Sequence, residues 1–384
     1  MPSELSDTPY ACALRRLADE HGTPLLVVRG RQIERNHQIL RRLLPDVAIF
    51  YAMKANPHPR IVETITGAGG GVEVCSTEEI ELCGRLGVEP RRVLYTHPIK
   101  TPAQIRKARA YGLDLLVCDN PVELEKVAAH APGCGILFRV KVTNPFCLIN
   151  LSEKFGCPVE DLESLVATAQ RLGLVPRGIC FHVGSQTTSP IPYVETLKML
   201  KDICNRLLVG GVRLDIMDIG GGFPLSHDPL SISMDEFCLP IANTLEHLFG
   251  SFNLCCEPGR FLVGNSAVLV SSVVGKAVRD HVNWYYIDDG LYASFSGKVF
   301  DKADYPLFAE RGGPEHGCVV AGPTCDSFDI VSSDRSLPEL EVGDLIWATN
   351  IGAYSVASAS RFNGFGPGKV LFIDKENDDD LQIA

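Results

Sequence analysis

The fold can be predicted from Val47-Ala48-Ile49-Phe50-Tyr51-Ala52-Met53-Lys54, a short β-branched and aromatic run that ends in a lysine. This composition is typical of a buried strand. Helical patterns lie between this run and later ones, among them Thr77–Leu86, Thr101–Tyr111 and Val159–Leu172. The later strand-like runs are Gly71–Ser76, Arg92–His97, Leu113–Asp119, Gly135–Val142, Gly178–Ser185, Leu214–Gly220 and Asn253–Pro258. Eight strands with helical crossovers predict a closed parallel (β/α)8 barrel.

The pattern changes after about residue 262, where strand-like runs are separated by Gly, Pro and Asp turns without long helices. These runs are Ala267–Val274, Trp284–Asp288, Cys318–Ala321, Leu345–Thr349 and Val370–Ile373. They predict an antiparallel β domain. Thr23–Arg29 precedes the first barrel strand, and we expect it to return to this second domain. The predicted division is therefore a barrel over 30–262 and a sandwich-like or barrel-like β domain formed by 1–29 with 263–384.

Composition limits the possible functions. Among 384 residues, 36 Lys and Arg stand against 47 Asp and Glu, so the net charge is −11, and a nucleic-acid-binding basic face is not expected. No run reaches the roughly 18 apolar residues of a membrane span. The fourteen cysteines include no Cys-x-x-Cys pair, and the ten histidines show no metal-ligand spacing, which favours reduced thiols and no metal site. Residues 1–7 lack a secretory pattern, so we expect a cytoplasmic globular protein.

The ends of the predicted barrel strands carry the candidate chemistry, because the active site of a (β/α)8 barrel lies at the C-terminal ends of its strands. The residues found there are Lys54, Glu73, His97, Arg139, His182, the run from Asp218 to Pro224 with Gly220, Gly221 and Gly222, and the run Glu257-Pro258-Gly259-Arg260. One edge of the barrel is thus expected to hold a lysine, two histidines, three carboxylates, two arginines and three consecutive glycines.

Each of these signals has an ordinary structural alternative. Lys54 could form a Schiff base with a carbonyl, or it could be a strand-end lysine whose amine reaches water. Gly220–Gly222 could bring backbone amides to a phosphate, or form a tight turn. Glu257 could keep a pyridine nitrogen protonated and Arg260 could bind a phosphate, or the two could be an ion pair at the strand end. His182 could stack on a flat cofactor, or be a satisfied core histidine. Taken together, these residue types indicate pyridoxal 5′-phosphate.

Several motifs occur in unbroken order over roughly residues 23–370, and on them the sequence resembles the fold-III pyridoxal-phosphate-dependent decarboxylases, the ornithine decarboxylases above all. The motifs are Tyr-Ala-Met-Lys-Ala-Asn (51–56), Leu-Ser-Glu-Lys-Phe-Gly (151–156), His-Val-Gly-Ser (182–185), Asp-Ile-Gly-Gly-Gly-Phe-Pro (218–224), Glu-Pro-Gly-Arg (257–260), Gly-Pro-Thr-Cys-Asp (322–326), Gly-Ala-Tyr (352–354) and Phe-Asn-Gly-Phe (362–365). The resemblance implies an alanine-racemase-like barrel followed by a β domain.

The resemblance also implies roles for individual residues at the cofactor. Lys54 carries the cofactor, Glu257 partners the pyridine nitrogen, and His182 stacks on the ring and takes part in catalysis. Glu73 orients Lys54, and Arg139 supports the acidic side of the site. The phosphate is held by Ser185, Gly220, Gly221, Gly222, Gly259, Arg260 and Tyr354.

A second set of implied roles concerns substrate and assembly. Cys325, as proton donor to the product carbon, and Asp326 reach the active site from the partner subunit of a homodimer. Asp301 and Asp326 receive the distal ammonium of a diamino acid. Two positions depart from the family pattern: Glu73 stands where an aspartate is usual, and Phe300 replaces the tyrosine usual before Asp301. The exact substrate therefore stays open.

The implied activity is decarboxylation of a basic diamino acid, most simply L-ornithine to putrescine in polyamine biosynthesis. Lysine, arginine, diaminopimelate or a modified diamino acid are alternative substrates. Diaminopimelate carries a distal carboxylate, which calls for an arginine, whereas Asp301 and the Cys325-Asp326-Ser327 run favour an ammonium. A catalytically inactive regulatory homologue is the alternative from another class. Such a homologue would be expected to lose Lys54, Cys325 or the phosphate glycines, and this sequence keeps all of them.

Overall fold

The computed structural model describes residues 9–225 and 232–374. The opening segment, on which the expectation about a secretory pattern rested, lies outside these ranges. The chain divides into two compact units: one comprises the chain up to Glu34 together with the chain from Leu262 onward, and the other comprises Arg35–Phe261. Helix α2 (Gly30–Leu43) contains the first point of division.

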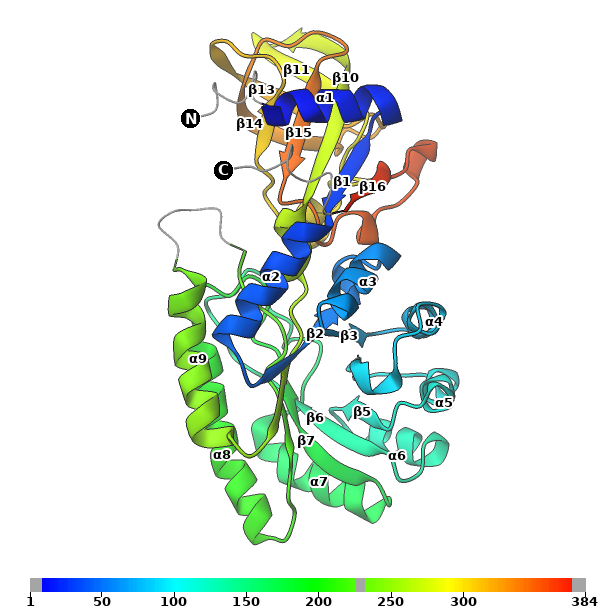
Figure 1. Ribbon diagram of the computed structural model, residues 1–384, viewed down its shortest axis with the longest axis vertical. Coiled ribbons are helices and arrows are strands. Elements are labelled where there is room, and N and C mark those ends of the chain that lie inside the picture. The colour runs from blue at the N-terminus through cyan, green and yellow to red at the C-terminus, as the bar shows by residue number, and fades with distance from the viewer. Residues whose placement is uncertain (1–8, 226–231, 375–384) are drawn as a thin grey trace. The chain divides into compact units, whose positions relative to one another are not determined.

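The Arg35–Phe261 unit is a closed barrel of eight strands, each hydrogen-bonded in parallel to the next (Figure 1). The eight predicted barrel strands are thereby confirmed, although most are shorter than the predicted runs. They are β2 (Val47–Ala52), β3 (Gly71–Val74), β4 (Val93–Tyr95), β5 (Leu115–Cys118), β6 (Gly135–Val140), β7 (Val175–Phe181), β8 (Ile216–Asp218) and β9 (Asn253–Cys256). Strand β9 pairs back onto β2 and closes the cylinder.

Helices connect successive barrel strands. They are α3 (Pro59–Gly67), α4 (Thr77–Arg85), α5 (Pro102–Tyr111), α6 (Pro121–His130), α7 (Leu162–Arg171), α8 (Ile191–Val209) and α9 (Met234–Phe249), and the short α10 (Arg260–Val263) follows β9. Local sequence fixes where several of them begin. Thr101 and Gln104 form a capping box at α5, and the Ser76 side chain accepts the backbone N–H of Glu79 at α4, as the sequence predicts. These starts place the preceding loops at the C-terminal edge of the barrel.

The other unit is built on an eight-stranded sheet. Its strands are β1 (Leu25–Arg29), β10 (Ala267–Arg279), β11 (Val282–Ile287), β12 (Leu307–Ala309), β13 (Glu315–Ala321), β14 (Ile330–Pro338), β15 (Leu345–Thr349) and β16 (Lys369–Ile373). The β1 strand pairs with β10, which confirms the predicted return of the N-terminal strand. Most pairs are antiparallel as expected, but β1–β16 and β11–β13 are parallel, so the sheet is mixed. Helices α1 (Pro9–His21) and α11 (Gly297–Phe300) complete this β domain.

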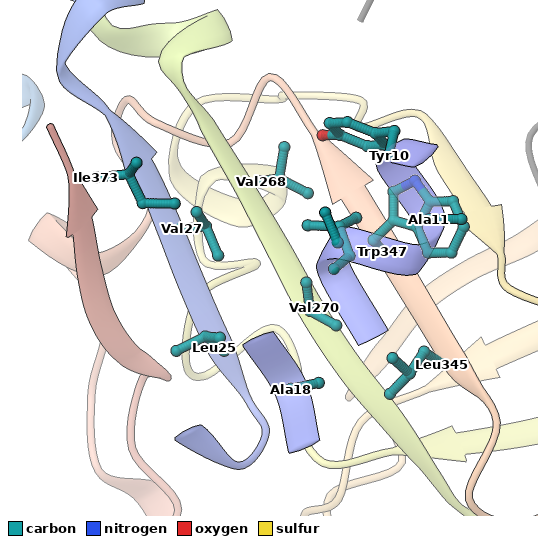
Figure 2. Close-up of a cluster of buried hydrophobic side chains, with 12 residues drawn as sticks. Tyr10, Ala11, Ala18, Leu25, Val27, Val268, Val270, Leu345, Trp347 and Ile373 are labelled. Atoms are coloured by element: carbon teal, nitrogen blue, oxygen red, sulfur yellow. The ribbon is translucent and has the colours of Figure 1, made fainter. Parts of the chain in front are cut away.

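The apolar core of the β domain forms where α1 packs on the sheet (Figure 2). Tyr10, Leu14 and Ala18 lie on one face of α1 at helical spacing and are buried against Val270 and Trp347. Trp347 is 1% exposed and lies at the centre of β15. Burying an aromatic side chain of this size contributes on the order of 3 kcal/mol to folding. The core thus secures the first helix to strands from the C-terminal third of the chain.

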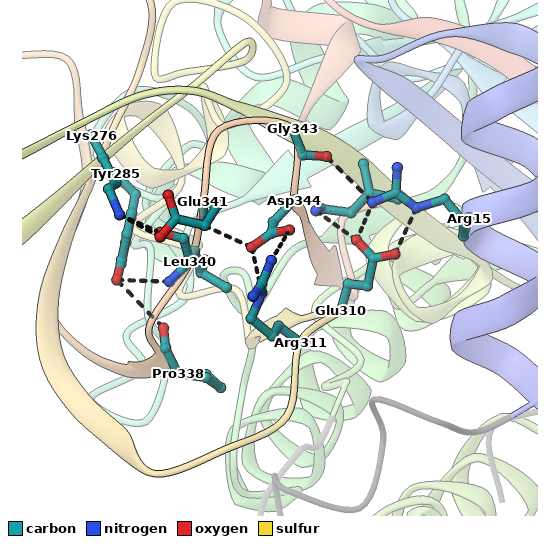
Figure 3. Close-up of polar contacts among 11 residues, drawn as sticks. Arg15, Lys276, Tyr285, Glu310, Arg311, Pro338, Leu340, Glu341, Gly343 and Asp344 are labelled. Atoms are coloured by element: carbon teal, nitrogen blue, oxygen red, sulfur yellow. Dashed lines mark hydrogen bonds and ion pairs between the residues drawn. The ribbon is translucent and has the colours of Figure 1, made fainter.

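Ion pairs fix the turns around this sheet (Figure 3). Arg15 on α1 makes a two-pronged hydrogen bond to the carboxylate of Glu310, with the Nε–Oε1 distance at 2.6 Å. Arg311 binds Asp344 in the same way, at 2.8 and 3.0 Å. The Tyr285 hydroxyl accepts the backbone N–H of Leu340 at 3.1 Å. These contacts hold the loop before β15 against the rest of the domain.

Two further sequence expectations can be compared with the described residues. No helix there combines the length and the apolar character that crossing a bilayer requires. All fourteen cysteines fall within the described ranges and are free thiols, most of them buried. Burial raises the pKa of the Cys118, Cys157 and Cys238 thiols to about 12, so these thiols stay protonated and behave as small apolar side chains.

Candidate active site

Lys54 is positioned by a short turn of 3₁₀ helix, η1 (Met53–Ala55), which directly follows β2. Its ammonium nitrogen Nζ lies 3.0 Å from Oε2 of Glu73, which stands on the neighbouring strand β3 and is fully buried. The other oxygen of Glu73, Oε1, accepts the Thr96 hydroxyl at 2.8 Å and the Cys75 thiol at 3.0 Å. Three side chains therefore orient the carboxylate that holds Lys54.

The charge of Glu73 is fixed by these neighbours. Burial raises the pKa of Glu73, but the Lys54 ammonium and the hydrogen bonds from Cys75 and Thr96 outweigh it, and the pKa lies below its ordinary value. Burial and the Glu73 charge raise the pKa of the Cys75 thiol well above its ordinary value. The thiol consequently keeps its proton and serves as a donor. The arrangement is an ionised carboxylate facing an amine, with two donors behind it.

His182 follows β7 and is held as a neutral ring. Its Nδ1 accepts the backbone N–H of Gly184 at 3.0 Å, which leaves the ring proton on Nε2. Burial, together with the charges of Arg139 and Lys54, lowers the pKa of His182 well below its ordinary value. A neutral imidazole presents a flat apolar face without the desolvation cost of a buried cation. This ring is suited to stack on a planar cofactor.

The three glycines after β8 form a turn that side chains would obstruct. Gly220 and Gly222 adopt φ values of 67° and 114°, a region that favours glycine. A Cβ on Gly221 would lie 2.6 Å from the carbonyl oxygen of Glu257, and one on Gly222 would lie 2.5 Å from that of Gly184. The backbone of this turn therefore runs close to the loops after β7 and β9. Such a turn is able to present peptide N–H groups to an anion.

Glu257 and Arg260 lie in the loop that joins β9 to α10. Glu257 is 8% exposed, and its Oε1 has no hydrogen-bond donor among the described residues. Burial and the charge of Glu73 raise the pKa of Glu257, while Lys54 acts in the opposite direction. Arg260 is 9% exposed and opens α10, directly after Gly259. The site thus contains a buried carboxylate oxygen that requires a donor and, three residues later, a guanidinium that suits an anion.

These observations test whether pyridoxal 5′-phosphate fits. Its aldehyde needs an amine, its pyridinium N–H needs a carboxylate, its ring needs a flat neighbour, and its phosphate needs backbone N–H groups and a cation. Lys54, Glu257, His182 and the Gly220–Gly222 turn offer these four features within one unit. The residues present therefore fit the cofactor.

The remaining predicted barrel residues line the same edge. Arg139, near the end of β6, places its guanidinium carbon 5.3 Å from the centre of the Phe155 ring. The backbone of Ser185 pairs with Ile149 in an isolated antiparallel bridge, with Ser185 N donating to Ile149 O at 3.0 Å. This bridge fixes the loop that follows His182, and the Ser185 side chain stays half-buried. His97, in the loop after β4, packs edge-on against Phe155, and its carbonyl oxygen accepts the Lys100 ammonium at 3.0 Å.

The other predicted site residues, Asp301, Cys325, Asp326 and Tyr354, belong to the β domain. Asp301 terminates α11 and is 9% exposed. The loop before β14 carries Cys325 and Asp326, and Tyr354 follows β15 with a φ of 53°. The buried carboxylate of Asp329 accepts the Thr324 hydroxyl and the backbone N–H of Leu291, both at 2.7 Å, and so anchors this loop.

Two residues that the sequence analysis did not single out hold the Cys325–Asp326 pair. The Tyr292 hydroxyl donates a short hydrogen bond to Asp326, and the Tyr292 ring stacks on Phe362 with ring centres 4.5 Å apart. The amide oxygen of Asn363 lies 3.1 Å from the Cys325 thiol. Both Phe362 and Asn363 belong to the Phe-Asn-Gly-Phe motif, which was recognised in the sequence. Their contacts with Tyr292 and Cys325 could not be predicted from the motif.

An apolar pocket of about 480 Å³ lies beside this loop in the β domain. Its lining includes Leu291, Tyr292, Val299, Phe300, Phe328 and Phe362. Phe300 and Phe328 are 69% and 59% exposed, which is unusual for such large apolar side chains. The candidate site residues therefore form two groups. One is polar and buried in the barrel, and the other lies in the β domain, where carboxylates stand beside exposed aromatic rings.

The barrel, its Schiff-base-competent lysine and its cofactor-compatible loops define a pyridoxal-phosphate enzyme of the barrel type. Comparison with known proteins agrees. The family described as "Pyridoxal-dependent decarboxylase, pyridoxal binding domain" matches residues 30–264. The chain belongs to this family and is a pyridoxal-phosphate-dependent amino-acid decarboxylase.

Individual relatives extend the match beyond the barrel. The chain is 37% identical to a lysine/ornithine decarboxylase of Selenomonas ruminantium over 353 residues, covering 92% of this chain and 90% of the relative. It is 35% identical to an ornithine decarboxylase of Schizosaccharomyces pombe, covering 90% and 81% of the two chains. A crystal structure of a lysine/ornithine decarboxylase from Vibrio vulnificus complexed with cadaverine superposes with a TM-score of 0.90 at 37% identity, covering 95% and 96%. The similarity therefore includes the β domain.

Proposed function

We propose that this enzyme removes the carboxyl group of a basic diamino acid, with L-ornithine as the preferred substrate and putrescine as the product of polyamine biosynthesis. The observation that carries the proposal is the pair of carboxylates, Asp301 and Asp326, in the β domain beside an apolar pocket. Hydrogen bonds from the Phe328 backbone and the Tyr292 hydroxyl lower the pKa of Asp326, so it is anionic at neutral pH. Carboxyl side chains at these two positions would attract a distal ammonium and disfavour a distal carboxylate.

The alternatives differ at the distal end of the substrate. Lysine carries the same ammonium one methylene further out, and a methylene is worth only about 1–3 kcal/mol of discrimination. The relatives whose names include lysine support keeping it as the first alternative. Arginine and a modified diamino acid would place a larger cation there. Diaminopimelate would bring a carboxylate towards Asp301 and Asp326, which makes it the least favoured.

The cofactor, when bound, supplies an electron sink for the pair of electrons released with CO₂. We propose that residues of this chain bind the cofactor, orient it and hold its protons. Lys54 binds the cofactor and Glu73 orients its amine. The Glu257 carboxylate accepts a hydrogen bond from the protonated ring nitrogen, and its negative charge stabilises that protonated ring. His182 covers the ring face.

Further residues complete the proposed machinery. The phosphate is bound by Ser185, Gly220, Gly221, Gly222, Gly259, Arg260 and Tyr354, and Arg139 supports the neighbouring side of the site. Cys325 delivers a proton to the α-carbon after CO₂ has left. Its thiol lies beside the Asn363 amide oxygen, which accepts and thereby orients the S–H group. Asp301 and Asp326 bind the distal ammonium by charge-assisted hydrogen bonds.

We also propose that the enzyme is a homodimer in which each active site combines the barrel of one chain with the Cys325–Asp326 loop of the other. The exposure of Phe300 and Phe328 supports a covering partner, because such aromatic surface is normally buried in an assembly. The buried, protonated thiols of the chain suit a reducing compartment, so we place the enzyme in the cytoplasm.

Complementation tests the shared site. Lys54→Ala and Cys325→Ala proteins are each expected to be nearly inactive, whereas their heterodimer contains one intact site. Equal, random mixing should restore about a quarter of wild-type activity, because half of the dimers are mixed and each has one working site of two. If mass spectrometry shows heterodimers and activity does not return, each site belongs to a single chain.

A substrate panel tests the substrate. CO₂ release from ornithine, lysine, arginine and diaminopimelate should rank ornithine first by kcat/KM and diaminopimelate last. Asp304→Asn is a matched control for Asp301→Asn, since Asp304 is a nearby surface carboxylate paired with Lys298 and Arg335. Only the Asp301 variant should change the ranking. A wild-type enzyme that prefers lysine or arginine would overturn the assignment of ornithine.

A further inference from the structure

Asp218 is a buried carboxyl that none of the proposed catalytic steps uses. It ends β8, is fully buried, and its Oδ1 accepts the backbone N–H of Gly220 at 2.8 Å. The carbonyl oxygen of the same Gly220 accepts the backbone N–H of Glu257, also at 2.8 Å. Gly220 thus connects the Asp218 carboxyl to Glu257, the residue that under the proposed function faces the cofactor ring nitrogen.

The two carboxyls meet within hydrogen-bond reach of each other. Oδ2 of Asp218 and Oε1 of Glu257 are both buried, and neither has a donor among the described residues. Two ionised carboxylates offer only acceptors, so this contact cannot be a hydrogen bond unless one of them carries a proton. An unsatisfied buried carboxylate oxygen costs at least as much as a lost hydrogen bond.

Among the residues that the structure describes, the cross-strand neighbours of Asp218 carry no positive charge. The strand register places Asp218 beside Cys180 on β7 and beside Cys255 on β9. Burial raises the pKa of both thiols well above the ordinary value, so they stay neutral. The charged groups that face this region are Glu257 on the β9 loop, Glu73 on β3, Lys54 after β2 and Arg139 on β6. Lys54 is already engaged by Glu73.

We propose that Asp218 is a positioning residue that carries a proton at neutral pH and donates it from Oδ2 to Glu257. One proton shared between the two carboxyls supplies the donor that their contact otherwise lacks. It also leaves Glu257 ionised while fixing its orientation toward the cofactor ring nitrogen. Asp218 thereby links the phosphate-binding turn to the carboxylate that controls the ring.

The assignment of the proton to Asp218 rather than Glu257 follows from their surroundings. Burial and the charge of Glu257 raise the pKa of Asp218 well above its ordinary value. Glu257 has Lys54 nearby, which favours its ionised form, whereas the nearest cross-strand neighbours of Asp218 are uncharged thiols. Two carboxyls in contact share one proton because both cannot ionise at short distance in a buried site.

The first test uses the cofactor-free protein and infrared spectroscopy. At neutral pH the wild type should show, in addition to the contribution of Asp289, whose pKa is about 7, the carbonyl stretch of a further protonated carboxylic acid that shifts on exchange into D₂O. Asp218→Asn should lose this band. Glu79→Gln, which removes another largely buried carboxyl near Lys54, is the control and should keep it. If the band persists unchanged in Asp218→Asn, Asp218 is not the protonated group and the proposal fails.

The second test compares two replacements of Asp218 by cofactor affinity. Asparagine reproduces a protonated aspartate, because its oxygen accepts from Gly220 while its amide N–H₂ donates to Glu257. Leucine has a similar size and does neither. We expect Asp218→Asn to bind pyridoxal phosphate within about threefold of wild type and Asp218→Leu to lose about tenfold or more. Equal loss in both variants, with circular dichroism showing both folded, would mean that the negative charge of Asp218 matters and would overturn the proposal.

Discussion

The barrel and the β domain carry their candidate site residues in opposite ways. In the barrel, Glu73 and Asp218 are fully buried and Glu257 is 8% exposed. In the β domain, Cys325 is exposed and the aromatic side chains beside Asp301 and Asp326 are among the most exposed large apolar groups. If the proposed roles hold, the residues of the cofactor site are enclosed within one chain, whereas the residues of the substrate site lie at an exposed apolar surface that a partner subunit would cover.

The two regions also differ in what their electrostatics can do. Burial lowers the pKa of His182 and raises that of Asp218, so that the ring stays neutral and the carboxyl keeps its proton. Glu73 stays ionised because Lys54, Cys75 and Thr96 outweigh the effect of burial. The Asp326 carboxylate in the β domain has a lowered pKa and is a fixed negative charge at neutral pH. Buried titratable groups with shifted pKa values determine which atoms of the site carry protons. Fixed charges at an exposed surface instead discriminate among substrates by their charge.

The largest effect should come from the barrel. Lys54→Ala should abolish turnover, because Lys54 is the lysine that the fold places against Glu73 at the end of β2. Borohydride reduction of the loaded wild type, followed by peptide mapping, should label Lys54. Lys107→Ala, which removes an exposed lysine paired with Glu81, is the control and should keep full activity. Labelling of a different lysine in the wild type would contradict the assignment.

A buried acid in the β domain tests whether strong pKa shifts are confined to the barrel. Burial raises the pKa of Asp289 to about 7, although its Oδ1 accepts backbone N–H groups from Gly290 and Ser294. The folded protein therefore binds a proton more tightly than the unfolded chain, whose carboxyl has the ordinary value. This contribution to stability is complete below about pH 4 and is lost as the pH rises through about 7.

Asp289→Asn should remove that dependence. The unfolding free energy of the wild type should fall between about pH 4 and 7 by up to about 4 kcal/mol relative to the variant. Urea unfolding at several pH values measures the difference. Asp334→Asn, which removes a carboxylate on β14, serves as a control. Parallel curves for wild type and Asp289→Asn would show that Asp289 titrates normally.

A third prediction concerns substrate recognition. Asp301→Asn should raise KM for a diamino acid by about tenfold or more, because a charge-assisted hydrogen bond contributes roughly 1.5–3 kcal/mol. The affinity for pyridoxal phosphate should stay the same, since Asp301 is not among the residues proposed to hold the cofactor. Steady-state kinetics and cofactor titration separate the two. An Asp301→Asn variant with unchanged kcat/KM would contradict the proposed role of Asp301 in substrate binding. A variant whose cofactor affinity falls as much as its KM rises would contradict the proposal that Asp301 serves the substrate alone.

The sequence predicted the barrel well because its strands are separate local patterns. Each apolar run from Val47 to Glu257 ends near a turn, and alternation with helices requires a parallel arrangement. The parallel pairs β1–β16 and β11–β13 were not predicted, since pairing between segments distant along the chain leaves no local signal. Helix α1 was also missed, although the spacing of Tyr10, Leu14 and Ala18 on one face was available as a signal.

For the site, residue types were predictable and their contacts were not. Lys54 and Glu73 could be assigned to neighbouring strand ends, but the sequence analysis gave no indication that Cys75 and Thr96 hold the same carboxylate. Period-2 alternation along β3 places Cys75 on the face of Glu73, which is a usable signal. Tyr292 was overlooked, and Asp218 was named without a role, for a similar reason: the partners of both are fixed by side-chain conformation rather than by spacing.

The smallest predicted effect concerns Cys75, and it asks how tightly the barrel group is held. The Cys75 thiol lies 3.0 Å from Oε1 of Glu73 and 4.0 Å from Nζ of Lys54. Cys75→Val keeps the approximate size of the side chain and removes the donor, whereas Cys75→Ser keeps a donor. Because a neutral donor to a charged group contributes about 1–2 kcal/mol, the valine variant should bind pyridoxal phosphate roughly fivefold to tenfold more weakly.

The serine variant decides what that loss means. If the hydrogen bond to Glu73 is the cause, Cys75→Ser should stay within about twofold of the wild type in cofactor affinity and in the pH at which the bound cofactor's absorbance changes. Cys12→Ser, at an exposed thiol on α1, should alter neither. Equal weakening in the serine and valine variants would show that the thiol acts by packing. Among the described side chains, only Thr96 and Lys54 would then hold Glu73 by hydrogen bonds. The Glu73 carboxylate would be less constrained than its three contacts indicate.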